Sequence, residues 1–243
     1  MDNVSCAKIM LSCLDLTSLH DNDSNSSIID FCKLSNTPYG NPAALCIFPQ
    51  FISVVKDHIQ PNIKVATVIN FPEGKNNIDI LSKDIPSAIA MGADELDVVF
   101  PYKTFLSGDL ESCSQYLKTA RKLCSKKTLK VILETGEIKQ IEKIRQASNL
   151  CIEAQADFIK TSTGKTKISA TPEVANIILE TIKASGKDVG FKASGGIKTF
   201  LEAKSYLVLA QSIMGSSWVN SSHFRIGASS LLNDLLQTIK QGY

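Results

Sequence analysis

Two lysines occupy positions inside segments that otherwise have the composition of buried strands. Lys160 lies in residues 157–162 and Lys192 lies in residues 189–194, and each segment runs directly into a turn that contains glycine. A single lysine near a strand end is expected to extend its ammonium group to solvent. Two lysines in the same setting weaken that interpretation and point to a shared site.

Such a pair of lysines could perform nucleophilic chemistry. Burial and a neighbouring like charge both disfavour the ammonium form, so a lysine beside a second cation loses its proton more easily. The neutral amine then attacks carbonyl carbon atoms and forms a Schiff base. Alternate residues of a strand share one face, and neighbouring parallel strands lie about 4.8 Å apart, so Lys160 and Lys192 could meet.

Acidic residues in two other apolar segments could complete this site. Asp97 lies between Leu96 and Val98, where a buried carboxylate needs a partner. We expect it to pair with one of the lysines, and a carboxylate bonded to an ammonium group can also relay protons. Glu134, at the end of residues 129–134, is a second candidate of the same kind.

Strand and helix patterns alternate along the chain and predict the framework that positions these residues. The expected strands are residues 43–48, 64–70, 95–100, 129–134, 157–162, 189–194, 211–214 and 224–227. Eight strands separated by helices predict the α/β class and a single (β/α)8 TIM barrel over residues 1–243. An open doubly wound sheet is the alternative, and residues 211–214 form the least regular strand pattern.

The N-terminal part of the chain is expected to lie outside this alternation. Residues 3–14 have helical spacing and predict a short N-terminal helix that covers an end of the barrel. Residues 14–19, which include Asp15 and Thr17, precede a polar run, and we interpret them as a loop. Asp15 and Thr17 would have a functional role only if this loop folds over a site.

Composition excludes several classes of protein. Of 243 residues, 44% are hydrophobic and 21% are charged, as in ordinary globular domains, and a net charge of +2 gives no preference for nucleic acid. No apolar run reaches the length of a membrane span and the first residues lack a basic secretory start, so we expect a cytoplasmic protein. Seven scattered cysteines and three distant histidines show no ligand spacing, so no metal site is expected.

Glycine-containing turns after three of the strands are candidates for phosphate binding. They are residues 162–165, 194–197 and 227–230, and Ser229 and Ser230 open the last helix. Backbone N–H groups at such turns and at helix starts bind phosphate, and barrels often do so near their last strands. The string Gly164-Lys165-Thr166 is not a nucleotide P-loop, because the glycine required earlier is Ile159.

Six segments, in order along nearly the whole chain, resemble the deoxyribose-phosphate aldolases, a family of class I Schiff-base aldolases. They are residues 14–17, 93–101, 130–136, 157–165, 190–196 and 225–230. The resemblance implies reversible cleavage of 2-deoxy-D-ribose 5-phosphate to acetaldehyde and D-glyceraldehyde 3-phosphate, in deoxyribonucleotide catabolism. It also implies phosphosugar and aldehyde substrates, no metal or organic cofactor, and a monomer or homodimer.

The same resemblance assigns roles to individual residues. Lys160 corresponds to the Schiff-base lysine, Lys192 to a second lysine that lowers its pKa, and Asp97 to the carboxylate of a proton relay. The residues that correspond to substrate-binding positions are Asp15, Thr17, Thr161, Gly164, Lys165, Gly195, Gly196, Gly227, Ser229 and Ser230. Tyr243 matches a final tyrosine that assists proton transfer in the family, although the tail here is short. Cys46 matches a cysteine linked to inactivation by aldehydes, or is a plain core cysteine.

Two other functions remain open from the residues alone. One is a different Schiff-base barrel aldolase, such as a transaldolase or a keto-sugar phosphate aldolase. The other is a catalytically silent protein that binds sugar phosphates, against which the presence of both lysines and Asp97 argues.

Overall fold

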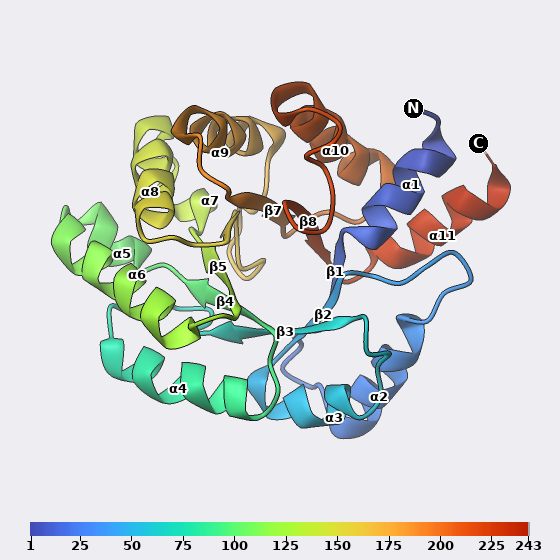
Figure 1. Ribbon diagram of the computed structural model, residues 1–243, viewed down its shortest axis with the longest axis horizontal. Helices are drawn as coiled ribbons and strands as arrows, with labels where there is room; N and C mark the ends of the chain where they lie inside the picture. The colour runs from blue at the N-terminus through green and yellow to red at the C-terminus, as the bar shows by residue number, and fades with distance from the viewer. Residues whose placement is uncertain (243) are drawn as a thin grey trace.

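The computed structural model describes residues 1–242, and within them eight parallel strands close into a barrel surrounded by helices (Figure 1). The strands are β1 (Leu14–Thr17), β2 (Ala44–Ile47), β3 (Lys64–Ile69), β4 (Glu95–Val99), β5 (Thr128–Ile132), β6 (Phe158–Lys160), β7 (Gly190–Ser194) and β8 (Phe224–Ala228). Neighbours in sequence pair in space, and β1 pairs with β8 to close the sheet. The predicted (β/α)8 TIM barrel is confirmed, and the open sheet is excluded.

Helices follow each strand and form the outer ring. They are α1 (Asn3–Ser12), α2 (Asn25–Leu34), α3 (Ile52–Lys56), α4 (Ile78–Ala90), α5 (Tyr102–Leu106), α6 (Leu110–Cys124), α7 (Thr135–Ile138), α8 (Ile141–Glu153), α9 (Pro172–Ser185), α10 (Phe200–Met214) and α11 (Leu231–Gln241), with a 3-10 turn η1 (Pro49–Phe51). Local chemistry sets their ends. The Thr171 hydroxyl accepts from the Val174 N–H at the start of α9, and Gly186 ends that helix in the left-handed conformation.

The predicted number of strands was right, but one strand was missed and one predicted strand is part of a helix. Residues 14–19 were expected to form a loop, whereas Leu14–Thr17 is β1, with Asp15 fully buried. A four-residue strand with a buried carboxylate shows little local signal, because partners from distant strands stabilise that charge. Residues 211–214 were expected to form a strand, whereas they are the last turn of α10, which ends at Met214. Gly215, at φ +93°, follows as the C-cap residue.

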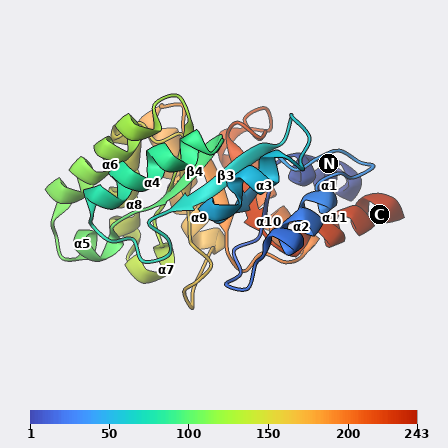
Figure 2. The same cartoon turned by 90° about the horizontal axis from the view of Figure 1, so that it is seen from below.

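The N-terminal helix α1 exists, but its predicted position was wrong. It packs against α11 and α10 in the outer ring and does not cover an end of the barrel (Figures 1 and 2). Its buried face, formed by Cys6, Ala7, Met10 and Leu11, belongs to the main hydrophobic core. Both ends of the described chain therefore lie close together, at adjacent helices.

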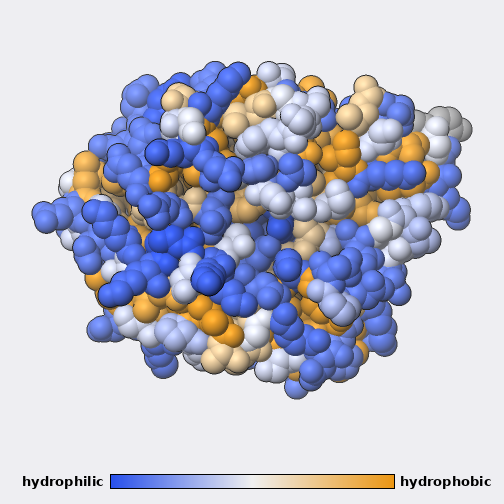
Figure 3. Space-filling view, in the orientation of Figure 1, coloured by the Kyte–Doolittle hydropathy of each residue, from blue (hydrophilic) through white to orange (hydrophobic). Residues whose placement is uncertain are grey.

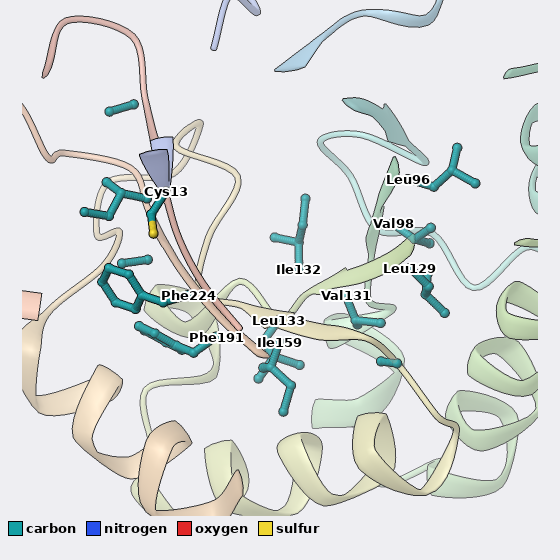
Figure 4. Close-up of a cluster of buried hydrophobic side chains, with 14 of the residues drawn as sticks. Cys13, Leu96, Val98, Leu129, Val131, Ile132, Leu133, Ile159, Phe191 and Phe224 are labelled. Carbon is teal, nitrogen blue, oxygen red and sulfur yellow. The ribbon is translucent and has the colours of Figure 1, made fainter. Parts of the chain in front are cut away.

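The hydrophobic core lies between the strands and the helices. Outward-facing strand residues such as Val131, Ile159, Phe191 and Phe224 form one contiguous buried cluster with the helices (Figure 4). Full burial of a side chain of this kind stabilises the fold by about 1.5–3 kcal/mol. The apolar positions of each strand thus face the helices, and the alternate positions face the barrel interior.

The barrel interior divides into an apolar part and a charged part. On β2 and β3 the inward-facing residues are small and apolar, namely Ala44, Cys46, Ala66 and Val68. The other strands point seven charged side chains inward, and none exposes more than a few per cent of its surface: Asp15, Glu95, Asp97, Lys130, Lys160, Lys192 and Arg225. Buried charges are stable only when paired, so these residues must satisfy one another.

The outer surface is mainly polar. On the face shown in Figure 3, hydrophilic residues predominate and hydrophobic residues appear between them in patches. Among the helices of residues 1–242, none has the length and apolar character needed to cross a bilayer.

Candidate active site

Lys160 and Lys192 face the barrel interior from paired positions of β6 and β7. The Lys160 Nζ lies 2.8 Å from the Asp97 Oδ2, and the Lys192 Nζ lies 2.7 Å from the same oxygen. The structure therefore brings together the two lysines and the aspartate that the sequence singled out. One carboxylate oxygen bridges two amines near the C-terminal ends of their strands, where barrel enzymes place their chemistry.

A larger network of charges surrounds this trio. The other Asp97 oxygen accepts from Lys130 at 2.8 Å, and Lys130 also contacts Glu95. Arg225 donates to Glu95 and to Asp15. Asp15 in turn contacts Lys192, so that the ion pairs form a continuous ring that returns to Asp97.

Sequence reasoning gave no role to Lys130, Glu95 or Arg225. The signal for Lys130 was the one used for the other lysines, a charge between apolar neighbours in a strand. Glu95 and Arg225 stand near strand starts, where a charged residue is usually solvated, so their pattern carried no comparable signal. In residues 1–242, no group of three or more His, Cys, Asp and Glu side chains is placed to hold a metal ion.

The count of charges explains which amine can be neutral. Lys130, Lys160, Lys192 and Arg225 are four cations, whereas Asp15, Glu95 and Asp97 are three carboxylates, so one positive charge is in excess. Lys160 contacts only Asp97 among these carboxylates, whereas Lys192 contacts two and Lys130 contacts three. Loss of the excess proton is therefore easiest at Lys160.

The pKa directions follow this arrangement. Burial lowers the pKa of Lys160, and the Lys192 charge adds to the effect, while Asp97 opposes it. Burial also acts to lower the pKa of Lys192, but Asp15 and Asp97 outweigh it and raise that pKa. Burial acts to raise the pKa values of Asp97 and Asp15, but the surrounding cations outweigh it and hold both low. Lys160 is thus the lysine of the network that approaches the neutral form.

A cavity of about 300 Å³ opens above Lys160 at the C-terminal end of the barrel. Among the residues with a predicted role, those that line it are Thr17, Lys160, Gly164, Lys165, Gly195, Gly196, Gly227, Ser229 and Ser230. The lining also includes four further residues of the predicted turns, namely Thr163, Ser194, Ile197 and Ala228, and three residues outside them, namely Leu19, His20 and Lys198. Asp15, Asp97 and Lys192 are not part of the lining and lie beneath it, in the barrel interior.

Backbone N–H groups around this cavity are free to bind an anion. Those of Gly164, Gly195, Gly196, Ser229 and Ser230 donate to no acceptor within residues 1–242. Ser229 and Ser230 also precede the first turn of α11, where the helix dipole favours negative charge. Lys165 and Lys198 add ammonium groups to the lining. The cavity therefore joins an amine with a lowered pKa to an anion-binding rim.

Gly195 keeps two of the glycine turns in contact. It has φ +87°, which side chains rarely adopt, and a Cβ atom there would lie 2.6 Å from the side chain of Ser169 and 3.1 Å from the Gly164 Cα. Only glycine fits without displacing the neighbouring turn, so this residue shapes the rim of the cavity.

Several residues with predicted roles have other contacts. The Thr161 hydroxyl donates to the Ser194 carbonyl and accepts from the Ser194 N–H, and Thr161 is not in the cavity lining. Cys46 is fully buried on β2, where burial and then Asp97 raise the pKa of its thiol. The Lys165 ammonium group donates to the Leu19 carbonyl at 2.7 Å and so bridges two loops. Tyr243 lies outside the described residues.

Comparisons with known proteins agree with the fold. A family model described as DeoC/LacD family aldolase matches residues 9–237. The solved structure of QR15, described as an aldolase, has a TM-score of 0.81 and 30% sequence identity over 96% of this chain and 97% of that one.

Two further structures extend the comparison. A Coccidioides immitis protein, provisionally named as a deoxyribose-phosphate aldolase, has a TM-score of 0.84 and 28% identity over 96% of this chain and 86% of that one. The deoxyribose phosphate aldolase of Aeropyrum pernix, described as a unique tetramer, has a TM-score of 0.77 and 23% identity over 100% of this chain and 98% of that one. At that identity the likeness speaks for the fold alone.

Proposed function

The chain belongs to the DeoC/LacD family of aldolases, and on this premise we propose that it is a class I deoxyribose-phosphate aldolase. In the proposed reaction, 2-deoxy-D-ribose 5-phosphate is cleaved reversibly to acetaldehyde and D-glyceraldehyde 3-phosphate, as a step of deoxyribonucleotide catabolism. The observation that carries the proposal is the placement of Lys160, a buried amine with a lowered pKa that opens into a cavity with an anion-binding rim.

The first half of the reaction forms a covalent intermediate. The neutral Lys160 amine attacks the aldehyde carbon C1 of the open-chain sugar, and the carbinolamine loses water to give an iminium ion. This cation accepts the electron pair that is released when the bond between C2 and C3 breaks. The enzyme therefore needs no other electron sink.

Proton transfers complete the cycle. The C3 hydroxyl group must lose its proton as the C2–C3 bond breaks, and the Asp97–Lys192 pair provides a route for it, directly or through water. The resulting enamine takes up a proton at C2, and hydrolysis of the iminium ion releases acetaldehyde and regenerates Lys160. Asp15 and Asp97 both contact Lys192, so Lys192 stays charged while Lys160 reacts.

The rim of the cavity would bind the 5-phosphate. Five N–H groups that have no acceptor within the described residues come from the turns after β6, β7 and β8, and the start of α11 contributes its dipole. A phosphate bound there would leave the remainder of the sugar over Lys160, because both line the same cavity. Binding of the 5-phosphate would explain why hydrogen-bond donors are concentrated in the rim above Lys160.

One experiment tests the proposal. The protein is incubated with 2-deoxyribose 5-phosphate and cyanoborohydride, acetaldehyde release is assayed without the reductant, and the modified peptide is mapped by mass spectrometry. We expect acetaldehyde release and an adduct on Lys160. Turnover of keto-sugar phosphates in place of the deoxyribose ester would identify another aldolase, and the absence of any adduct would remove the Schiff-base assignment.

A further inference from the structure

One buried carboxylate of this end of the barrel takes no part in the charge network. Glu134 follows β5 in the left-handed conformation, at φ +58°, and its side chain is buried. The N–H groups of its two neighbours, Leu133 and Thr135, bond to the carbonyls of Lys160 and Thr161. The segment around Glu134 is therefore tied to the end of β6, and the carboxylate is directed at the loop that follows β6.

All hydrogen-bond donors to the Glu134 carboxylate within residues 1–242 come from this loop. The Thr163 N–H donates at 3.3 Å, the Thr163 hydroxyl donates as well, and the Thr166 hydroxyl donates at 3.2 Å. No ion pair involving Glu134 occurs in the same part of the chain. A carboxylate with these partners acts as an anchor for the loop and not as a counter-ion of the lysines.

The hydrogen bonds to Glu134 determine which N–H groups of the loop after β6 have no acceptor within residues 1–242. The Thr163 hydroxyl gives its proton to Glu134 and accepts from the Lys165 N–H at 3.0 Å. The Thr163 N–H thus donates to Glu134 and the Lys165 N–H donates to Thr163, whereas the intervening Gly164 N–H is left without an acceptor in residues 1–242. Gly164 lines the cavity and touches the Gly195 turn, so its position sets the distance between two parts of the rim.

A second contact holds the far end of the same loop. Gly136 packs so closely on Ile168 that a Cβ atom at this glycine would lie 2.0 Å from the Ile168 carbonyl oxygen. The segment from Glu134 to Gly136 therefore holds the loop at two places, by hydrogen bonds to residues 163 and 166 and by close packing against residue 168. Residues 164 and 165, which line the cavity, lie between residues that are held in this way.

We propose that Glu134 is a positioning residue for substrate phosphate: it fixes the loop after β6 so that the Gly164 N–H and the Lys165 side chain meet the phosphate ester. This inference rests on the proposed function and deepens it. Within residues 1–242 no hydrogen bond or ion pair joins the Glu134 carboxylate to the Lys160 ammonium group. The effect of Glu134 is confined to recognition of the phosphorylated end of the substrate, and the Schiff-base chemistry proceeds without it.

The test compares Glu134→Gln with Glu137→Gln, an exposed glutamate on the short helix α7 that begins directly after Glu134. For each protein, kcat/KM is measured with 2-deoxyribose 5-phosphate and with unphosphorylated 2-deoxyribose. For Glu134→Gln we expect about a tenfold loss with the phosphate ester, a change within about twofold with the free sugar, and unchanged trapping of acetaldehyde on Lys160. Glu137→Gln should behave like the unmodified protein with both sugars.

Each other outcome has a defined meaning. An equal loss with both sugars, or no loss with either, would overturn the role of Glu134 while leaving the aldolase proposal intact. Failure of the unmodified protein to cleave the phosphate ester would overturn the proposed function and this inference with it. Should Glu134→Gln not fold, Thr163→Val removes the hydroxyl that receives the Lys165 N–H, and the same selective loss is expected. Binding of inorganic phosphate, measured by calorimetry, should weaken in both variants.

Discussion

The nitrogen atoms of Lys160 and Lys192 share one oxygen of Asp97, at 2.8 and 2.7 Å, from paired positions on adjacent strands. The two amines nevertheless differ, because Lys192 also contacts Asp15, whereas Lys160 contacts no second carboxylate within residues 1–242. Burial and the charge of Lys192 lower the pKa of Lys160, whereas at Lys192 the two carboxylates outweigh burial and raise the pKa. One residue is thereby prepared as a nucleophile, and the other is retained as a cation.

Replacing the nucleophile should abolish the chemistry. We expect Lys160→Leu to reduce acetaldehyde release to background and to eliminate the mass shift after reductive trapping, because no other amine of the network has a lowered pKa. Lys167→Leu, an exposed lysine in the loop after β6, is the matched control and should retain both. Trapping at full stoichiometry in Lys160→Leu would contradict the assignment.

Removal of the neighbouring cation should make Lys160 harder to deprotonate. In Lys192→Met the like charge is absent and Asp97 loses one of its three cationic partners, so the pKa of Lys160 rises. The acid limb of the profile of kcat/KM against pH should move to higher pH. The maximal rate should fall about 100-fold, because the proton relay is also lost. An unshifted acid limb would show that Lys192 does not tune Lys160.

Removal of the Glu95 carboxylate should shift the acid limb of the profile of kcat/KM against pH to lower pH, opposite to the effect of removing Lys192. Glu95→Gln leaves Lys130 and Arg225 with one fewer negative partner, so the network gains positive charge and Lys160 gives up its proton more easily. We expect the acid limb to move to lower pH, although Glu95 contacts Lys130 and not Lys160. Glu142→Gln, on an exposed surface of α8, is the control. A shift to higher pH would contradict the charge count.

The buried carboxylates should also govern stability against acid. The cations around Asp15 outweigh its burial and hold its pKa below the ordinary value, so its pairing stabilises the folded state fully above about pH 4. That contribution is lost as pH falls through the lowered pKa. Asp15→Asn should cost about 3–5 kcal/mol in urea unfolding at pH 7, and the difference from the unmodified protein should shrink towards pH 3. Asp30→Asn, in an exposed ion pair, should show no such dependence.

A comparison of two glycines with positive φ can separate the cost of an unfavourable backbone conformation from an effect on substrate binding. Gly195 and Gly186 have φ values of +87° and +62°, and a Cβ atom would collide with Ser169 at the first but meet nothing within 4 Å at the second. We expect both alanine variants to lose about 1 kcal/mol of stability from the backbone conformation alone. Only Gly195→Ala should also raise KM for the phosphate ester, because it displaces the turn that contacts Gly164. Equal KM values would exclude a role of this turn in the rim.

Some of the site could be predicted from local sequence. Lys160, Lys192 and Asp97 were recognisable because a charge between apolar strand residues is costly wherever the chain places it. The glycine turns after β6 and β7 were recognisable because a strand pattern, a glycine and a helix pattern follow one another directly in the sequence. Strand order followed from the alternation of patterns, since parallel neighbours require crossover helices.

The sequence by itself therefore determined the barrel, the presence of two buried lysines and the turns that follow them, because each depends on residues adjacent in the chain. Only the tertiary structure decided that residues 14–17 form β1, that Lys130, Glu95 and Arg225 complete the network, and that Lys192 contacts two of its carboxylates and Lys160 one. The reason is electrostatic. The state of a buried amine depends on how many carboxylates surround it, and Asp15 reaches Lys192 from the opposite end of the sequence, across the seam where β1 and β8 close the barrel.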